Sequence, residues 1–251
     1  MHSLITDNDS TLMQEEILDE IAKFAGPEAS KQIEEITNSQ MNGIFNSNIK
    51  KLSFKESLEK RVNILVEYTK KKNSLISIDN LRTIAKDQMH FSNHVENLLN
   101  NIIKNHGSLK SKFFIFSGGF KEIIFLKIKE LNIPENEKQI LKNQTYANCF
   151  EYNLDCKIIG LDIKNSQMLS DTAKRDKTIF LIKNNLIEFN LENNIKIIGL
   201  GDGSNDVGMV PQKYGFCVAY TEHVYRENTV KKADNKIATS FLDVKEYLKN
   251  K

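Results

Sequence analysis

Carboxylate side chains occupy two short polar segments near opposite ends of the chain. Asp7 and Asp9 directly follow the strand-like residues 4–6, and Asp202 and Asp206 stand four apart in the segment GDGSND. The chain turns where a strand ends, so carboxylates two residues apart can reach one site. Several carboxylates at one sheet edge supply the oxygen ligands and the charge that Mg²⁺ requires. Together the segments predict a magnesium site, although each alone is also typical of a polar turn that begins a helix.

A serine and two glycines end another apolar run and suit a phosphate group. The N–H groups at the helix start that follows Ser117, Gly118 and Gly119 can bind an anion, and the hydroxyl adds a further contact. An isolated SGG is more often an ordinary turn. Lys177, ahead of the apolar stretch 179–182, has the charge to neutralise a phosphate beside the carboxylates, whereas most lysines are merely solvated.

These segments need strands to position them. The apolar runs 113–116 and 195–200 are each bounded by a glycine turn and followed by a helix-like stretch, which is typical of β-α units on a parallel sheet. Residues 4–6 and 215–219 are weaker strand candidates. The sequence therefore predicts an α/β fold with a doubly wound, Rossmann-like, mostly parallel sheet, whose ligands bind at the carboxyl ends of the strands.

The composition and hydrophobic spacing of the chain change after the first strand. Residues 14–99 show helical spacing with few glycines and prolines, which predicts a helical cap inserted into a core made of residues 1–13 and 100–251. Residues 146–163 contain two short apolar segments around a polar turn and predict a β-hairpin.

Composition excludes several classes of protein. With 35 Lys+Arg against 33 Asp+Glu, the chain has no basic excess, which argues against a nucleic-acid partner. The three cysteines form no CxxC pair, so no disulfide framework or zinc site is expected. No apolar run approaches the roughly 18 residues of a membrane span, and the early strand leaves no room for a signal peptide. We therefore expect no membrane partner and a cytoplasmic protein. Whether it is a monomer or a homodimer stays open.

The order and spacing of these motifs resemble the haloacid-dehalogenase (HAD) superfamily of aspartate-nucleophile phosphatases, and within it the phosphoserine phosphatases. The resemblance covers nearly the whole chain. The residues that carry it are DNDST from Asp7, EEILDEIA from Glu15, QMNG from Gln40, the stretch 54–62, SGGF from Ser117, Lys177-Thr178 and GDGSND from Gly201.

This resemblance implies a role for each motif. Asp7 is the implied nucleophile and Asp9 the general acid/base. Magnesium is held by the Asp7 carboxylate, the Asp9 backbone carbonyl and Asp202, with Asp206 in support. Lys177 supplies charge at the transition state. The implied phosphate and substrate contacts are Met41, Ser117, Gly118, Lys177 and Asn205.

The implied reaction is magnesium-dependent hydrolysis of a small phosphorylated amino acid. It converts O-phospho-L-serine to L-serine and inorganic phosphate through an aspartyl-phosphate, the last step of serine biosynthesis. The resemblance also assigns Glu16 to the substrate ammonium and Arg61 to its carboxylate. By helical spacing alone, Arg61 lies at the edge of an apolar stripe, where a guanidinium either meets an anion or extends to water. Glu16 faces either the cleft or solvent.

Some residues depart from the family pattern, and other functions compete. Thr6 and Asn8 replace apolar residues beside the nucleophile, and Ser92-Asn93 replaces Pro-Gly, which favours a looser loop on the return from the cap. The main alternative is the same chemistry on phosphothreonine, phosphohomoserine or a sugar or alcohol phosphate. An ion-pumping ATPase domain shares GDGxND, but usually has threonine where Asp9 stands. A catalytically silent binding protein on the same scaffold is a further alternative.

Overall fold

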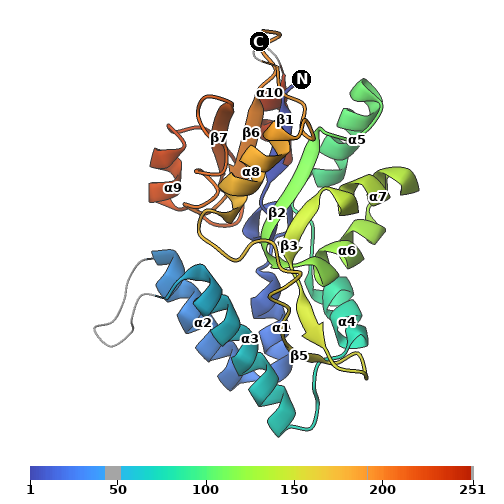
Figure 1. Cartoon of the computed structure of the whole chain (residues 1–251), viewed down its shortest axis with the longest axis vertical. Helices are drawn as coiled ribbons and strands as arrows, with labels where there is room; N and C mark the ends of the chain where they lie inside the picture. Colours follow the sequence, from blue (N-terminus) through green and yellow to red (C-terminus); the bar gives the residue numbers. More distant parts are fainter. Residues whose placement is uncertain (43–51, 191, 250–251) are drawn as a thin grey trace.

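A parallel sheet forms the centre of the molecule. The computed structural model describes residues 1–42, 52–190 and 192–249 (Figure 1). Within them, six strands lie in the order β3-β2-β1-β6-β7-β8, all parallel, which confirms the predicted fold class. The strands are β1 (Ser3–Thr6), β2 (Phe113–Phe120), β3 (Thr145–Asn148), β6 (Ile197–Gly201), β7 (Gly215–Tyr220) and β8 (Ile237–Ala238).

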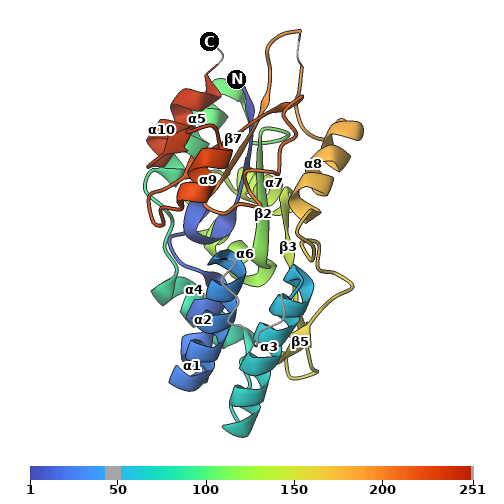
Figure 2. The ribbon, with the colours of Figure 1, turned by 90° about the vertical axis from the view of Figure 1, so that its left-hand side faces the viewer.

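Side chains alternate between two cores, one on each face of the sheet. Leu4, Phe113 and Ile115 belong to the larger core, together with apolar residues of α5 (Val95–His106) and α10 (Phe241–Leu248). The alternate residues of the same strands, such as Ile5 and Phe114, pack in a second core with Leu181 of α8 (Ala173–Lys183). Figure 2 shows α5 and α10 on one side of the strands and α8 on the other. Burial on both faces explains why these strands are apolar throughout.

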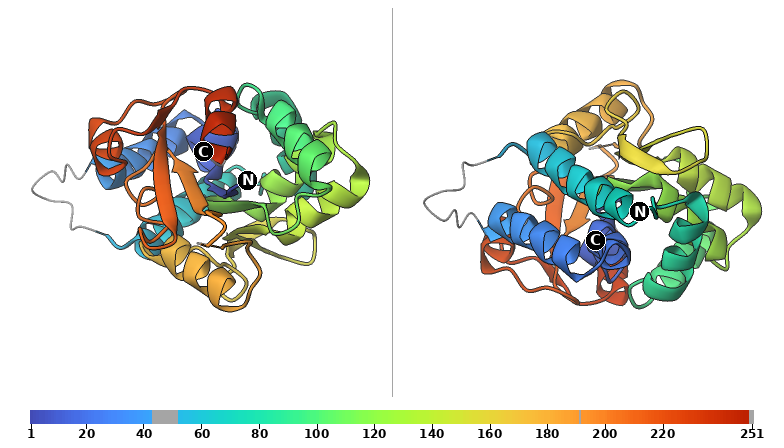
Figure 3. Two further views of the ribbon diagram at one scale, coloured as in Figure 1. Left: turned by 90° about the horizontal axis from the view of Figure 1, so that it is seen from above. Right: turned by 90° about the horizontal axis from the view of Figure 1, so that it is seen from below.

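The inserted helices lie beyond the carboxyl ends of the strands (Figure 1). Two of them begin with capping boxes, in which Ser53 pairs with Glu56 and Ser77 with Asn80. Figure 3 shows α2 and α3 side by side. These helices are α1 (Ile17–Ala25), α2 (Pro27–Asn42), α3 (Phe54–Lys71) and α4 (Ile78–Gln88). The boundary predicted after residue 99 falls inside α5, which packs against α10 on the sheet side. The exact division between cap and core stays a prediction.

The return from the insert is fastened to the sheet, contrary to the looser loop expected from its sequence. Ser92 is buried, and its hydroxyl donates to the Thr11 carbonyl at 2.5 Å and contacts Nε2 of His223 at 2.8 Å. The Asn93 side chain donates to Glu222. A Pro-Gly pair has no side-chain donors for such contacts. We call Ser92, Asn93, Glu222 and His223 the return clasp.

The remaining elements flank the sheet. The predicted hairpin is present as the antiparallel strands β4 (Phe150–Tyr152) and β5 (Ile158–Leu161), and it packs against α3. Its predicted first residues, however, belong to β3 of the main sheet. The other helices are α6 (Lys121–Glu130), α7 (Glu135–Asn143) and α9 (Glu227–Lys232). No helix in the described parts of the chain has the length and apolar character needed to cross a bilayer.

A substitution at Gly215 tests how closely β6 and β7 pack. A Cβ atom at this position would lie 1.7 Å from the carbonyl oxygen of its register partner Ile197, which is backbone and cannot move aside. We expect Gly215→Ala to lower the free energy of unfolding by about 2–3 kcal/mol, as measured by chemical denaturation. Gly208→Ala is the matched control, because the nearest atom to its added Cβ is 3.8 Å away. Equal stability of the two variants would contradict the strand packing.

Candidate active site

The loop after β1 carries the first two predicted catalytic residues. Because β1 is central, with β2 and β6 as its neighbours, Asp7 lies between the carboxyl ends of those two strands. Its Oδ1 atom accepts the Asn8 backbone N–H at 2.7 Å. Ser10 has a φ of 53°, a left-handed conformation in which the chain turns sharply. Asp7 and Asp9, which precede this turn, both line one cavity.

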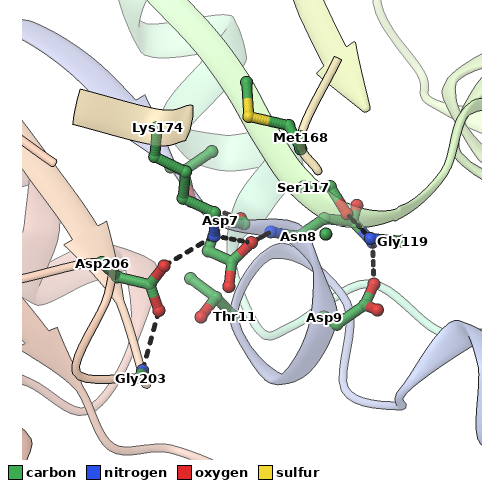
Figure 4. Close-up of polar contacts among 12 residues, drawn as sticks. Asp7, Asn8, Asp9, Thr11, Ser117, Gly119, Met168, Lys174, Gly203 and Asp206 are labelled. Carbon is green, nitrogen blue, oxygen red and sulfur yellow. Dashed lines mark hydrogen bonds and ion pairs between the residues drawn. The ribbon is translucent and has the colours of Figure 1, made fainter. Parts of the chain in front are cut away.

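Asp7, Asp202 and Asp206 converge, as the sequence predicted. Each offers an oxygen atom within 4.8 Å of the others, and all three residues are buried. Asp206 is oriented by the Gly203 N–H, which donates to its Oδ2 at 2.8 Å (Figure 4). Burial, followed by repulsion from Asp206, raises the pKa of Asp7 to about 7. Three carboxylate oxygens form a hard donor set that fits a divalent cation such as Mg²⁺. The side chain of Asp9 lies outside this group.

Lys174, rather than the predicted Lys177, faces these carboxylates. Its Nζ atom lies 2.7 Å from Oδ1 of Asp7 and 2.6 Å from Oδ1 of Asp206. Burial lowers the pKa of Lys174, but the pull of Asp206 and Asp7 outweighs it, so the net shift is upward. Lys174 therefore stays charged where phosphoryl oxygens would approach Asp7.

The placement of Lys177 at the phosphate is thus wrong. Its ammonium lies over the rings of Tyr146 and Phe180, 4.5 and 5.0 Å from their centroids. Burial and the nearby Lys121 lower its pKa. Helical spacing does not choose between the two lysines, because Lys174 precedes the buried Thr178 by four residues and Lys177 precedes the buried Leu181 by the same interval. No local signal in the sequence therefore singled out Lys174.

Asp9 occupies a setting that favours its protonated form. Burial, then repulsion from Glu16 and Asp7, raises its pKa well above the ordinary value, although Asn8 Nδ2 donates to its Oδ1 at 2.6 Å. A Cβ atom at Gly119 would lie 2.9 Å from Oδ2 of Asp9, so a larger residue there would displace this carboxyl. A carboxyl with a raised pKa can hold a proton for transfer near neutral pH.

The predicted phosphate loop is held together by a residue that the sequence did not reveal. Gly118 lines the cavity, whereas Ser117 is fully buried, and its Oγ accepts the Gly119 N–H at 2.9 Å. The buried Asn148 donates to the carbonyl oxygens of Gly118 and Met168 at 2.8 and 3.2 Å and accepts the Met168 N–H at 2.9 Å. Asn148 thereby joins the phosphate loop to the segment that leads to Lys174. A polar residue at the carboxyl end of a strand was the available signal.

The other end of the site contains the two residues assigned to the amino-acid part of the substrate. Glu16 and Arg61 both line a cavity of about 200 Å³ with Asp7. Of the two orientations that the sequence left open for each residue, the structure therefore shows the one that faces the cavity. Ser10 Oγ donates to Oε1 of Glu16 at 2.9 Å, and Arg61 Nη1 donates to Thr37 Oγ1 at 3.2 Å.

Two further substrate contacts were predicted, and Arg226 was missed. Asn205 lines the cavity. The side chain of Met41 lies outside the described part of the structure. Arg226 lines the cavity and forms an ion pair with Asp202. It precedes α9 in the loop after β7, and only its place after a strand pointed to it.

Sheet, insert and site together define a HAD-type phosphoric monoester hydrolase. No protein-family model matches the sequence. A phosphoserine phosphatase of Methanocaldococcus jannaschii is 30% identical over 218 residues, covering 86% of this chain and 84% of that protein. One of Rattus norvegicus is 27% identical over 222 residues, covering 88% and 82%. A solved substrate-bound phosphoserine phosphatase complex, 24% identical, matches the fold with a TM-score of 0.70 over 99% of both chains. The chain belongs to the phosphoserine phosphatase family.

The two lysines of α8 provide a matched pair for testing the corrected assignment. Lys174→Met removes the cation that faces Asp7, and we expect kcat for phosphate-ester hydrolysis to fall about 10²- to 10³-fold. Lys177→Met removes a cation that lies over aromatic rings, and we expect kcat within about twofold of wild type. Steady-state phosphate release measures both. A large loss in Lys177→Met alone would restore the original assignment.

Proposed function

We propose that this chain hydrolyses O-phospho-L-serine to L-serine and inorganic phosphate through an aspartyl-phosphate on Asp7, with Mg²⁺ as cofactor, as the last step of serine biosynthesis. The observation that carries the proposal is that the Asp7 carboxylate, paired with Lys174, shares one cavity with Glu16 and Arg61. The first pair suits a phosphate ester, and the second suits the ammonium and carboxylate of an amino acid. The substrate is a small molecule, and the cytoplasmic location stays a prediction.

Each step of the reaction has a residue in place. The Asp7 carboxylate attacks phosphorus, and the bond to the serine oxygen breaks as Asp9 gives that oxygen its proton. Asp9 then takes a proton from the water that attacks the aspartyl-phosphate, which releases phosphate and frees Asp7. Lys174 holds a fixed positive charge beside the phosphoryl oxygens in both transition states.

The cluster of three aspartate carboxylates explains why the proposed reaction needs a cation. Asp7, Asp202 and Asp206, and the Asp9 backbone carbonyl by family resemblance, are the groups that would hold Mg²⁺. When bound, the ion screens the repulsion between the phosphate dianion and Asp7. Lys174 and Arg226 bring two positive charges to three carboxylates, so this group still fits an additional cation.

Phosphate release from L-phosphoserine is the direct test. We expect wild-type protein to release phosphate with Mg²⁺, to lose that activity with EDTA and to regain it when Mg²⁺ is restored. Asp7→Asn removes the nucleophile and should lower kcat by about 10⁴-fold or more. Asp234→Asn, an exposed acid near the C-terminus, is the control. Retained activity of Asp7→Asn would refute the nucleophile, and activity only on sugar phosphates would refute the substrate.

Arg61→Ala tests recognition of the substrate carboxylate. Loss of a charge-assisted contact should lower kcat/KM for phosphoserine about 10- to 100-fold. For p-nitrophenyl phosphate, which has no carboxylate, we expect a change of less than threefold. Arg82→Ala, whose side chain pairs with Asp79 on the exposed surface of α4, is the control. Equal losses on both esters would show that Arg61 acts on folding or on the phosphate rather than on the carboxylate.

A further inference from the structure

Asp19 is a second carboxylate at the amino-acid end of the cavity. It lies three residues beyond Glu16, in the first turn of α1, and both residues line the cavity. Residues three apart on a helix are neighbours on one face. The neighbouring Glu20 is paired with Lys23 at 2.6 Å. No hydrogen bond or salt bridge joins the Asp19 carboxylate to another side chain in the parts of the chain that the structure describes.

The nearby guanidinium leaves both carboxylates available. The charge of Arg61 acts on Glu16 and Asp19, but no salt bridge forms between Arg61 and either acid in the described structure. Arg61 Nη1 donates to Thr37, and its buried Nε has no hydrogen-bond partner among the described residues. The guanidinium therefore keeps a donor for a ligand anion, and the two carboxylates keep acceptors for a ligand cation.

Stabilisation of the α1 N-terminus does not account for the environment of Asp19. A carboxylate in the first turn is stabilised by the helix dipole, which lowers its pKa. Burial followed by repulsion from Glu16 instead raises the pKa of Asp19 to about 6, against the pull of Arg61. Glu34 and Glu20 add to this repulsion. The surroundings of Asp19 are therefore too negative for its charge, and a bound cation would be stabilised there.

The number of acceptors points to the same ligand. An ammonium group has three N–H donors, whereas Oε1 of Glu16 already accepts the hydroxyl of Ser10. We propose that Asp19 binds the substrate ammonium together with Glu16, so that the enzyme selects phosphate esters that carry a primary amine. This inference rests on the proposed function and adds a specificity-determining residue to it.

Two substrates of the same skeleton test the inference. 3-Phosphoglycerate has a hydroxyl group where phosphoserine has an ammonium, and both carry the phosphate and the carboxylate. We expect Asp19→Asn to lower kcat/KM for L-phosphoserine about tenfold, the equivalent of one charge-assisted contact, and to leave 3-phosphoglycerate within about twofold of its wild-type value. Phosphoethanolamine, which has the amine without the carboxylate, should lose as much as phosphoserine.

Two further variants serve as controls, and the results that would overturn the inference differ from those that would refute the proposed function. Glu20→Gln removes a neighbouring acid that is already paired with Lys23, and it should leave the preference between the two substrates unchanged. Asp19→Glu, which keeps the charge, should retain more of the preference than Asp19→Asn and serves if the latter does not fold. Equal losses on both substrates, or an unchanged preference, would overturn the inference. Wild-type protein that does not release phosphate from phosphoserine would instead refute the proposed function.

Discussion

Repulsion among buried carboxylates is the constraint on which the site depends. Asp7, Asp202 and Asp206 present oxygen atoms within 4.8 Å of one another in a buried setting, where like charges are poorly screened. Only a parallel sheet with β1 at its centre brings these residues together, because they follow adjacent strands that end at the same edge. Lys174 offsets part of the repulsion through two short ion pairs. The cluster is thus unfavourable for folding and suited to binding cations, which is the usual compromise of an active site.

The charges of the cavity are separated along its length, and that separation gives the substrate an orientation. Lys174 and the carboxylates that it contacts lie at the sheet edge, where phosphorus would be attacked. Arg61 and Glu16 come from the inserted helices and face the same cavity. A molecule with a phosphate at one end and a zwitterionic group at the other matches this arrangement in one direction only. The return clasp adds a tie between insert and sheet, since Ser92 contacts both the Thr11 carbonyl and His223.

Sequence patterns predicted the features that are encoded by neighbouring residues, such as strands and acidic motifs. They missed the side chains whose roles depend on contacts between distant segments. The strands and the two acidic motifs could be identified because apolar runs and glycine turns are continuous in the chain. Lys174 was missed since choosing between two lysines in one helix requires knowing which face of α8 is buried. Asn148 and Arg226 act through contacts with distant segments, at Gly118 and Asp202, and no local pattern encodes such partners. Ser92-Asn93 were expected to loosen a loop because their partners, His223 and Glu222, lie more than a hundred residues away.

The sheet and the inserted helices contribute different residues to the cavity, and this separation affects how such an enzyme can change its substrate. The groups that act on phosphorus in the proposed reaction belong to the loop after β1, to α8 and to the loop after β6, all fixed by the sheet. Glu16 and Arg61 stand instead at the start of α1 and within α3, whose positions depend on packing among the inserted helices. Substitutions in those helices can alter which leaving group is accepted while Asp7 and Lys174 keep their geometry. Under the proposed function, specificity is therefore the less constrained property of this fold, because it depends on the charges of the insert rather than on those of the sheet edge.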